Sequence, residues 1–78
     1  MPERKQIKVE IDVKVIYTEK GESKKEEFTE STVVIDDSPA RAGKMVGDSI
    51  KRRETERYGK DLESITFKSV STLVLEDE

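Results

Sequence analysis

The first third of the chain alternates between apolar and charged residues. From position 7 to position 17 every odd residue is apolar: Ile7, Val9, Ile11, Val13, Val15 and Tyr17. The even positions between them are charged as far as residue 14: Lys8, Glu10, Asp12 and Lys14. Period two with β-branched residues on one side is typical of a strand with one buried face. The pattern predicts a strand over about residues 6–17, with the charged side of its sheet facing water.

A turn and a second strand follow. Gly21, in the polar segment 18–23, suits a backbone position of positive φ. The returning strand, about residues 24–35, is less regular than the first. Phe28 fits one phase of the alternation, whereas Val33 and Ile35 fit the other. A bulge between Phe28 and Val33 is one explanation of this change of phase.

Residues 39–58 carry the pattern of a helix. Asp37 or Ser38 can cap its N-terminus, and Pro39 fits its first turn. Gly59 suits the position just after its last residue. The aspartates before the helix favour the positive end of its dipole, and this capping role explains them better than a metal site does.

The predicted helix is apolar on one face in its first half only. At 100° per residue, one stripe is formed by Ala42, Val46 and Ile50 and is widened by Pro39 and Met45. Gly43 and Gly47 flank the stripe and would let the helix approach the sheet closely. Beyond Ile50 the line continues to Arg53 and Arg57. We therefore expect the first three turns to pack on the sheet and the second half to form a charged extension.

The last strand is predicted over about residues 63–75. One face is predicted to carry Ile65, Phe67, Leu73 and Leu75. Val70 and Val74 fall on the opposite, otherwise polar face. The element order predicts an α+β fold, ββαβ, in which a three-stranded and mainly antiparallel sheet packs against one helix. A right-handed crossover favours the strand order 2-1-3, and the order 1-2-3 remains open.

Composition narrows the class of function. The chain has 78 residues, the size of one small domain, with 42% charged residues and a net charge of −3. It has no cysteine and no histidine, which excludes thiol nucleophiles, disulfides and the commonest general base. We identify no catalytic, cofactor-binding or metal-binding residues and expect a protein that is not an enzyme. No apolar run reaches a membrane span and no signal peptide is evident, so a cytoplasmic location is expected.

The last strand is the leading candidate for function. Its segment 69–75 contains no charge, proline or glycine, and it lies at an edge in both strand orders. An uncharged edge invites pairing with another strand. We therefore expect a protein-interaction or accessory protein that forms a homodimer or adds a partner's strand, with Val70, Thr72 and Val74 at the contact. The competing explanation is an edge shielded by sheet twist or by the acidic segment 76–78.

The basic end of the helix supports an alternative function. Four cations gather in sequence at Arg52, Arg53, Arg57 and Lys60. They could bind nucleic acid or a phosphate ligand. Cations are also favoured at the C-terminal end of any helix, and i,i+4 pairs with acids are common on a solvated face. The sequence therefore ranks anion binding below strand pairing.

Overall fold

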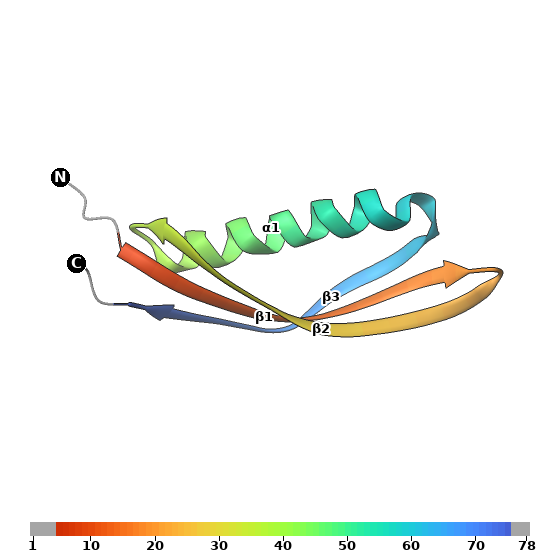
Figure 1. Ribbon diagram of the computed structural model, residues 1–78, viewed down its shortest axis with the longest axis horizontal. Helices are drawn as coiled ribbons and strands as arrows, with labels where there is room; N and C mark the ends of the chain where they lie inside the picture. The colour runs from red at the N-terminus through yellow and green to blue at the C-terminus, as the bar shows by residue number, and fades with distance from the viewer. Residues whose placement is uncertain (1–4, 76–78) are drawn as a thin grey trace.

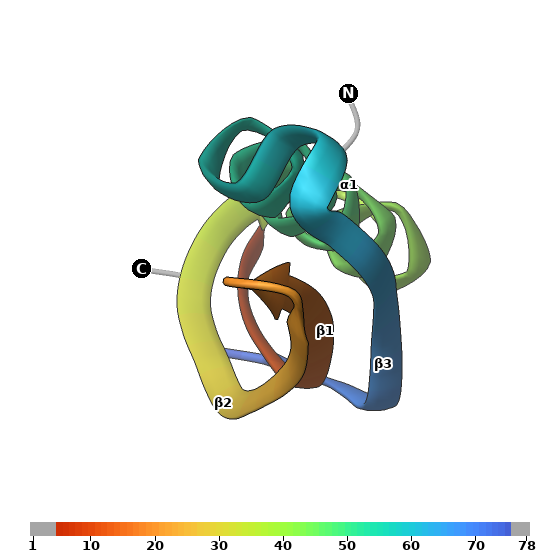
Figure 2. The same ribbon diagram turned by 90° about the vertical axis from the view of Figure 1, so that its right-hand side faces the viewer.

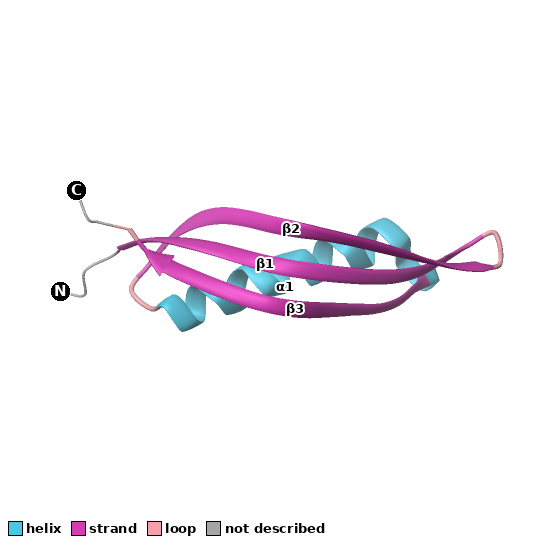
Figure 3. Cartoon of the chain, turned by 90° about the horizontal axis from the view of Figure 1, so that it is seen from below, coloured by secondary structure: helices cyan, strands magenta, loops and turns pink. Residues whose placement is uncertain are grey.

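The alternating N-terminal segment becomes β1 (Lys5–Glu19), the central strand of the sheet. The computed structural model describes residues 5–75. The other elements are β2 (Glu22–Asp36), α1 (Pro39–Tyr58), the short 3-10 helix η1 (Gly59–Asp61) and β3 (Leu62–Val74). Both β2 and β3 pair with β1 in antiparallel fashion, in the order β2-β1-β3, with α1 on one face (Figures 1 and 3). The predicted ββαβ fold and strand order 2-1-3 are confirmed. The acidic segment 76–78 lies outside the described residues.

The β1–β2 hairpin is continuous from end to end. Lys20 and Gly21 form a two-residue turn with φ values of 52° and 79°, the combination found in tight hairpin turns. The register runs from Glu19 opposite Glu22 to Lys5 opposite Asp36 without a shift. The bulge expected between Phe28 and Val33 is therefore wrong. The irregular pattern arises because the helix-facing side of β2 includes polar residues, which bond to side chains of α1.

The described part of the chain is long and narrow, with extents of 53 × 18 × 16 Å. Its radius of gyration is 14.9 Å, whereas a compact domain of this length has about 11–12 Å. Strands of 15 residues span about 50 Å, but a 20-residue helix spans only about 30 Å. The tip of the β1–β2 hairpin consequently projects beyond α1 (Figure 1).

The helix begins and ends as its sequence predicts. The hydroxyl of Ser38 accepts a hydrogen bond from the backbone N–H of Arg41 at 3.3 Å, so Ser38 is the N-cap. At the other end, Gly59 has φ of 56° and donates its N–H to the carbonyl of Thr55. The positive φ favours glycine at this position.

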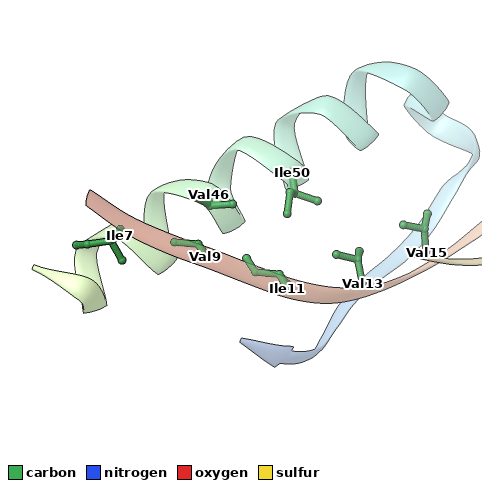
Figure 4. Close-up of a cluster of buried hydrophobic side chains, with 8 residues drawn as sticks. Ile7, Val9, Ile11, Val13, Val15, Val46 and Ile50 are labelled. Atoms are coloured by element: carbon green, nitrogen blue, oxygen red, sulfur yellow. The ribbon is translucent and has the colours of Figure 1, made fainter. Parts of the chain in front are cut away.

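The core lies between β1 and α1 and is built mainly by one strand (Figure 4). Its buried apolar residues are Ile7, Val9, Ile11, Val13 and Val15 of β1 and Ala42, Val46 and Ile50 of α1. Viewed along the long axis, α1 lies on one side of the sheet while β2 and β3 flank β1 (Figure 2). The edge strands β2 and β3 thus flank the core. Each pairs with β1 on one side only, so the backbone groups on its other side lie at the surface.

The second half of α1 is not a free extension, and this prediction is wrong. The stripe continues from Ile50 in steps of four to Glu54 and Tyr58 rather than to Arg53 and Arg57. Glu54 is buried, and Tyr58 packs against the core. Spacing of four residues keeps side chains on one helix face, which is why these two residues turn toward the sheet.

Candidate protein interface

The edge formed by β3 is the least charged edge of the sheet. Its residues 69–74 are all exposed, and none of them is charged. The opposite edge, formed by β2, carries charged side chains at seven of its 15 positions: Glu22, Lys24, Lys25, Glu26, Glu27, Glu30 and Asp36. Charge protects an edge strand from pairing with another chain. Between the two edges, β3 has the longer segment without this protection, residues 69–74, whereas the uncharged segment of β2 is limited to residues 31–35.

The backbone of β3 alternates in the direction of its hydrogen-bonding groups. The N–H of Leu75 donates to the carbonyl of Gln6 at 2.8 Å, and from there to Ser69 the register with β1 is regular. In an antiparallel ladder every second residue bonds to the neighbouring strand. Ser71 and Leu73 therefore bond to β1. The N–H and C=O groups of Val70, Thr72 and Val74 point away from it.

The side chains of Val70 and Val74 lie on the helix-covered face of the sheet, so their predicted placement on the polar face is wrong. Asp12 lies opposite Ser69 whereas Val13 lies opposite Phe67, which leaves Lys68 as an extra residue in β3. This bulge shifts the phase of the strand by one residue. Phe67, Val70 and Val74 now share the face that the sequence pattern divided.

A groove runs between α1 and this part of β3. It has a volume of about 480 Å³. Its lining comprises Pro39, Ala40, Gly43, Lys44, Gly47, Asp48 and Lys51 of α1 and Phe67, Val70 and Thr72 of β3. Gly43 and Gly47 let α1 approach β3 closely along this groove: a Cβ on Gly47 would lie 3.0 Å from the ring of Phe67. Sequence analysis identified these glycines as allowing close approach but missed the groove beside them.

The open face of the sheet carries a second feature that the sequence did not reveal. Leu73 is 59% exposed there and shares a cross-strand row with Lys8 and Val33, which is 51% exposed. The bulge in β3 turns Leu73 to this face. The sequence did not predict this patch for two reasons. The bulge in β3 was not foreseen, and a bulge was wrongly expected in β2.

The middle of the open face is polar and internally bonded. Asp12 accepts hydrogen bonds from the hydroxyls of Thr29 and Ser69, each at 2.7 Å. These bonds to the charged form lower the pKa of the Asp12 carboxyl. Asp12 thereby joins all three strands across the exposed face.

The four predicted anion-binding residues do not form one cluster with equal roles. Arg53 binds Glu54 at 2.9 Å and Glu30 at 3.2 Å, with its guanidinium 5.7 Å from the ring centre of Phe28. It therefore ties α1 to β2. Arg57 lies over the ring of Tyr58, and Arg52 and Lys60 are exposed on α1 and η1. Anion binding by this segment stays a prediction.

Glu54 is the buried charged residue that sequence analysis missed. Its residue surface is 1% exposed, and only one carboxylate oxygen, the one facing Arg53, has a hydrogen-bond partner within the described residues. The regular i,i+4 series from Ala42 could have located it. The residue type argued against burial, because carboxylates seldom lie in a core without full pairing.

Tyr58 fixes the end of the helix to the hairpin. Its ring stacks on Tyr17 with a centroid distance of 4.3 Å, and its hydroxyl donates to Glu26 at 2.9 Å. Burial and the neighbouring carboxylate raise the pKa of Tyr58 to about 12. The contact joins three elements near the point where the hairpin leaves the helix.

Comparisons with protein-family models, with curated proteins and with solved structures find no match for this chain. Among the described residues, no helix is both long and apolar enough to cross a membrane. The same residues contain no group of three or more acidic side chains placed to hold a metal ion together. The edge of β3, the groove beside it and the charged surface are therefore the features that bear on function.

Proposed function

We propose that this protein is a small non-catalytic interaction domain that binds by adding a strand to the edge of β3. The observation that carries the proposal is the outward direction of the backbone groups of Val70, Thr72 and Val74 on an uncharged edge. Strand addition draws its affinity from such main-chain groups. Self-association and binding of another protein's strand are two forms of the same interaction.

The groove beside β3 gives this edge a means of selecting its partner. Side chains of an added strand alternate between the two faces of the extended sheet. Those on the helix side would enter the groove, where Val70 and Phe67 offer apolar contact and Lys44 and Lys51 offer positive charge. Those on the other side would lie next to Leu73. Main-chain bonds and side-chain pockets together are the usual composition of a strand-binding site.

The test uses a synthetic peptide with the sequence of residues 66–78, added to the isotope-labelled full chain. We expect its binding to shift the amide signals of Val70, Thr72 and Val74 and to slow their hydrogen exchange. Thr72→Pro should abolish binding, since proline removes an outward N–H and leaves the bonds to β1 in place.

Ser31→Pro is the matched control on the other edge. By the same alternation, Ser31 in β2 directs its N–H away from β1. This variant should bind the peptide as the unmodified chain does. Shifts confined to β2, or equal loss of binding in both variants, would contradict the proposal.

The exposed cations of α1 and η1 favour one competing function, the binding of nucleic acid or a phosphate ligand. Phosphate-driven binding weakens steeply between about 50 and 200 mM salt, whereas strand addition does not. A mobility-shift assay with single-stranded RNA at 50 mM salt tests it, with Arg52→Ala/Arg57→Ala as the variant. Absence of binding at low salt eliminates this function.

A further inference from the structure

We infer that the strand added to β3 is β3 of a second copy of this chain, antiparallel and related by a two-fold axis at Thr72. The inference rests on the proposed strand addition and names its partner. A two-fold axis brings the same surface of both copies together, so the edge must be complementary to itself. The backbone, the side chains and the position of α1 each meet this condition.

The backbone condition is met by the register about Thr72. Thr72 would lie opposite Thr72 of the second copy, and Val70 opposite Val74. All three residues direct their backbone groups outward, as the regular β1–β3 register requires. Each of these three residues then forms a hydrogen-bonded pair with its opposite residue, in which the two residues exchange two N–H···O bonds. The three pairs give about six new hydrogen bonds across the axis. If the register were shifted by one residue, the outward N–H and C=O groups of one copy would lie opposite Ser71 and Leu73 of the other. The backbone groups of those two residues already bond to β1.

The side-chain condition is met on both faces. On the helix side, Val70 would pack against Val74 of the second copy. On the open side, Leu73 would lie directly opposite Ser71 of the second copy. It would also lie diagonally across the axis from Leu73 of the second copy, about 7–8 Å away. No charged residue lies between positions 69 and 75, so the paired strands place no like charges opposite each other. The exposed valines, 52% for Val70 and 44% for Val74, would lose contact with water.

The position of α1 also allows two copies to pair through β3. An axis perpendicular to the sheet leaves both helices on the same face. Gly43 stands over Val70 and Thr72, since a Cβ there would lie 3.5 and 3.6 Å from their side chains. The two grooves would therefore join across the axis, with Ala40 and Lys44 of each copy on their walls. A domain with so thin a core gains from this added burial.

Disulfide trapping tests the register directly, because the natural chain has no cysteine. Thr72→Cys should form a covalent dimer under mild oxidation, since a hydrogen-bonded pair separates Cα atoms by about 5.5 Å. Val70→Cys is the matched control: the two copies of position 70 would lie roughly 14 Å apart, too far for a disulfide. Combining Val70→Cys with Val74→Cys should restore cross-linking. Equal cross-linking of the two single variants would overturn the register.

Sedimentation of the full chain tests the partner. We expect a dimer for the unmodified protein and for Ser31→Pro, and a monomer for Thr72→Pro. A monomer for the unmodified chain at several hundred micromolar would overturn the inference. The proposed function is tested separately from the dimer. It fails if the chain is a monomer and the peptide of residues 66–78 does not shift the amide signals of β3.

Discussion

At the scale of single residues, Arg53 links the buried Glu54 of α1 to Glu30 of β2. Glu54 is buried with one oxygen unpaired among the described residues, and Arg53 supplies the bond to the other. Removing one member of a buried ion pair leaves an uncompensated charge, whereas replacing both by apolar groups is often neutral. Here only Glu54 is buried, and Arg53, whose side chain is 49% exposed, supplies the compensating charge.

We predict that Arg53→Ala lowers the free energy of unfolding by about 1–3 kcal/mol, because it leaves the Glu54 carboxylate unpaired. Arg53→Ala combined with Glu54→Met should recover most of this loss. Arg52→Ala, a change at an exposed neighbour, should stay within about 0.5 kcal/mol of the natural chain. Urea unfolding of the four proteins measures these differences. An Arg53→Ala effect no larger than that of Arg52→Ala would contradict the assigned role.

Tyr58 predicts a loss of stability at alkaline pH. Its pKa is about 12 in the folded chain and near 10 when unfolded. The unfolded state therefore loses the tyrosine proton first, and folding weakens as the pH rises from 10 to 12. Tyr58→Phe keeps the ring on Tyr17 but has no proton to lose. Its stability should fall less steeply over this window in urea titrations, and parallel curves for the two proteins would refute the prediction.

At the scale of elements, the approach of α1 to β3 depends on one glycine more than on the other. A Cβ on Gly43 would make ordinary contact with Val70 at 3.5 Å, whereas one on Gly47 would lie 3.0 Å from Phe67. Alanine is the better helix former by about 1 kcal/mol. The sign of each substitution is decided by whether the strand leaves room for the methyl group.

We predict that Gly43→Ala raises the free energy of unfolding by about 0.5–1 kcal/mol and that Gly47→Ala gains less or loses. Phe67→Leu removes the ring atoms in the way, so the two substitutions should become more similar in that background. Thermal and urea unfolding provide the measurement. A larger gain for Gly47→Ala than for Gly43→Ala would show that the helix does not depend on this close approach.

At the scale of the whole molecule, a long three-stranded sheet covered by one shorter helix leaves much of its surface to solvent. The same geometry leaves two open edges and one open face. Pairing through β3 would close one edge of each copy and produce a sheet of six strands. A chain stabilised by its own partner unfolds in a concentration-dependent way.

We predict that the thermal midpoint of the unmodified chain rises with protein concentration between about 5 and 500 μM, whereas that of Thr72→Pro stays constant. The reason is that dilution favours the monomer, which has fewer bonds on β3. Circular dichroism at several concentrations measures the midpoint. Ser31→Pro should behave as the unmodified chain does, and a constant midpoint for all three proteins would contradict a folded dimer.

The sequence by itself determined the local elements and their order. The faultless alternation from Ile7 to Val15 specified the central strand, since no other strand offers so continuous an apolar face. Ser38, Pro39 and Gly59 marked the helix ends because capping is a local interaction between neighbouring residues. Right-handed crossover then favoured the order 2-1-3 over 1-2-3, and the structure shows 2-1-3. The absence of charge from residues 69–75 could also be read from the sequence, because it is a property of composition.

Only the tertiary structure decided which way the side chains of β3 face and what the second half of α1 contacts. The bulge at Lys68 depends on pairing with β1. Its shift of one residue moves Val70 to the helix-covered face and Leu73 to the open face, each opposite to the face that the sequence pattern predicted. The burial of Glu54 depends on partners from another part of the chain, for which its own sequence neighbourhood gives no signal except spacing. Edge exposure was therefore predictable from the strand, whereas the groove beside it arose from long-range pairing that no single segment encodes.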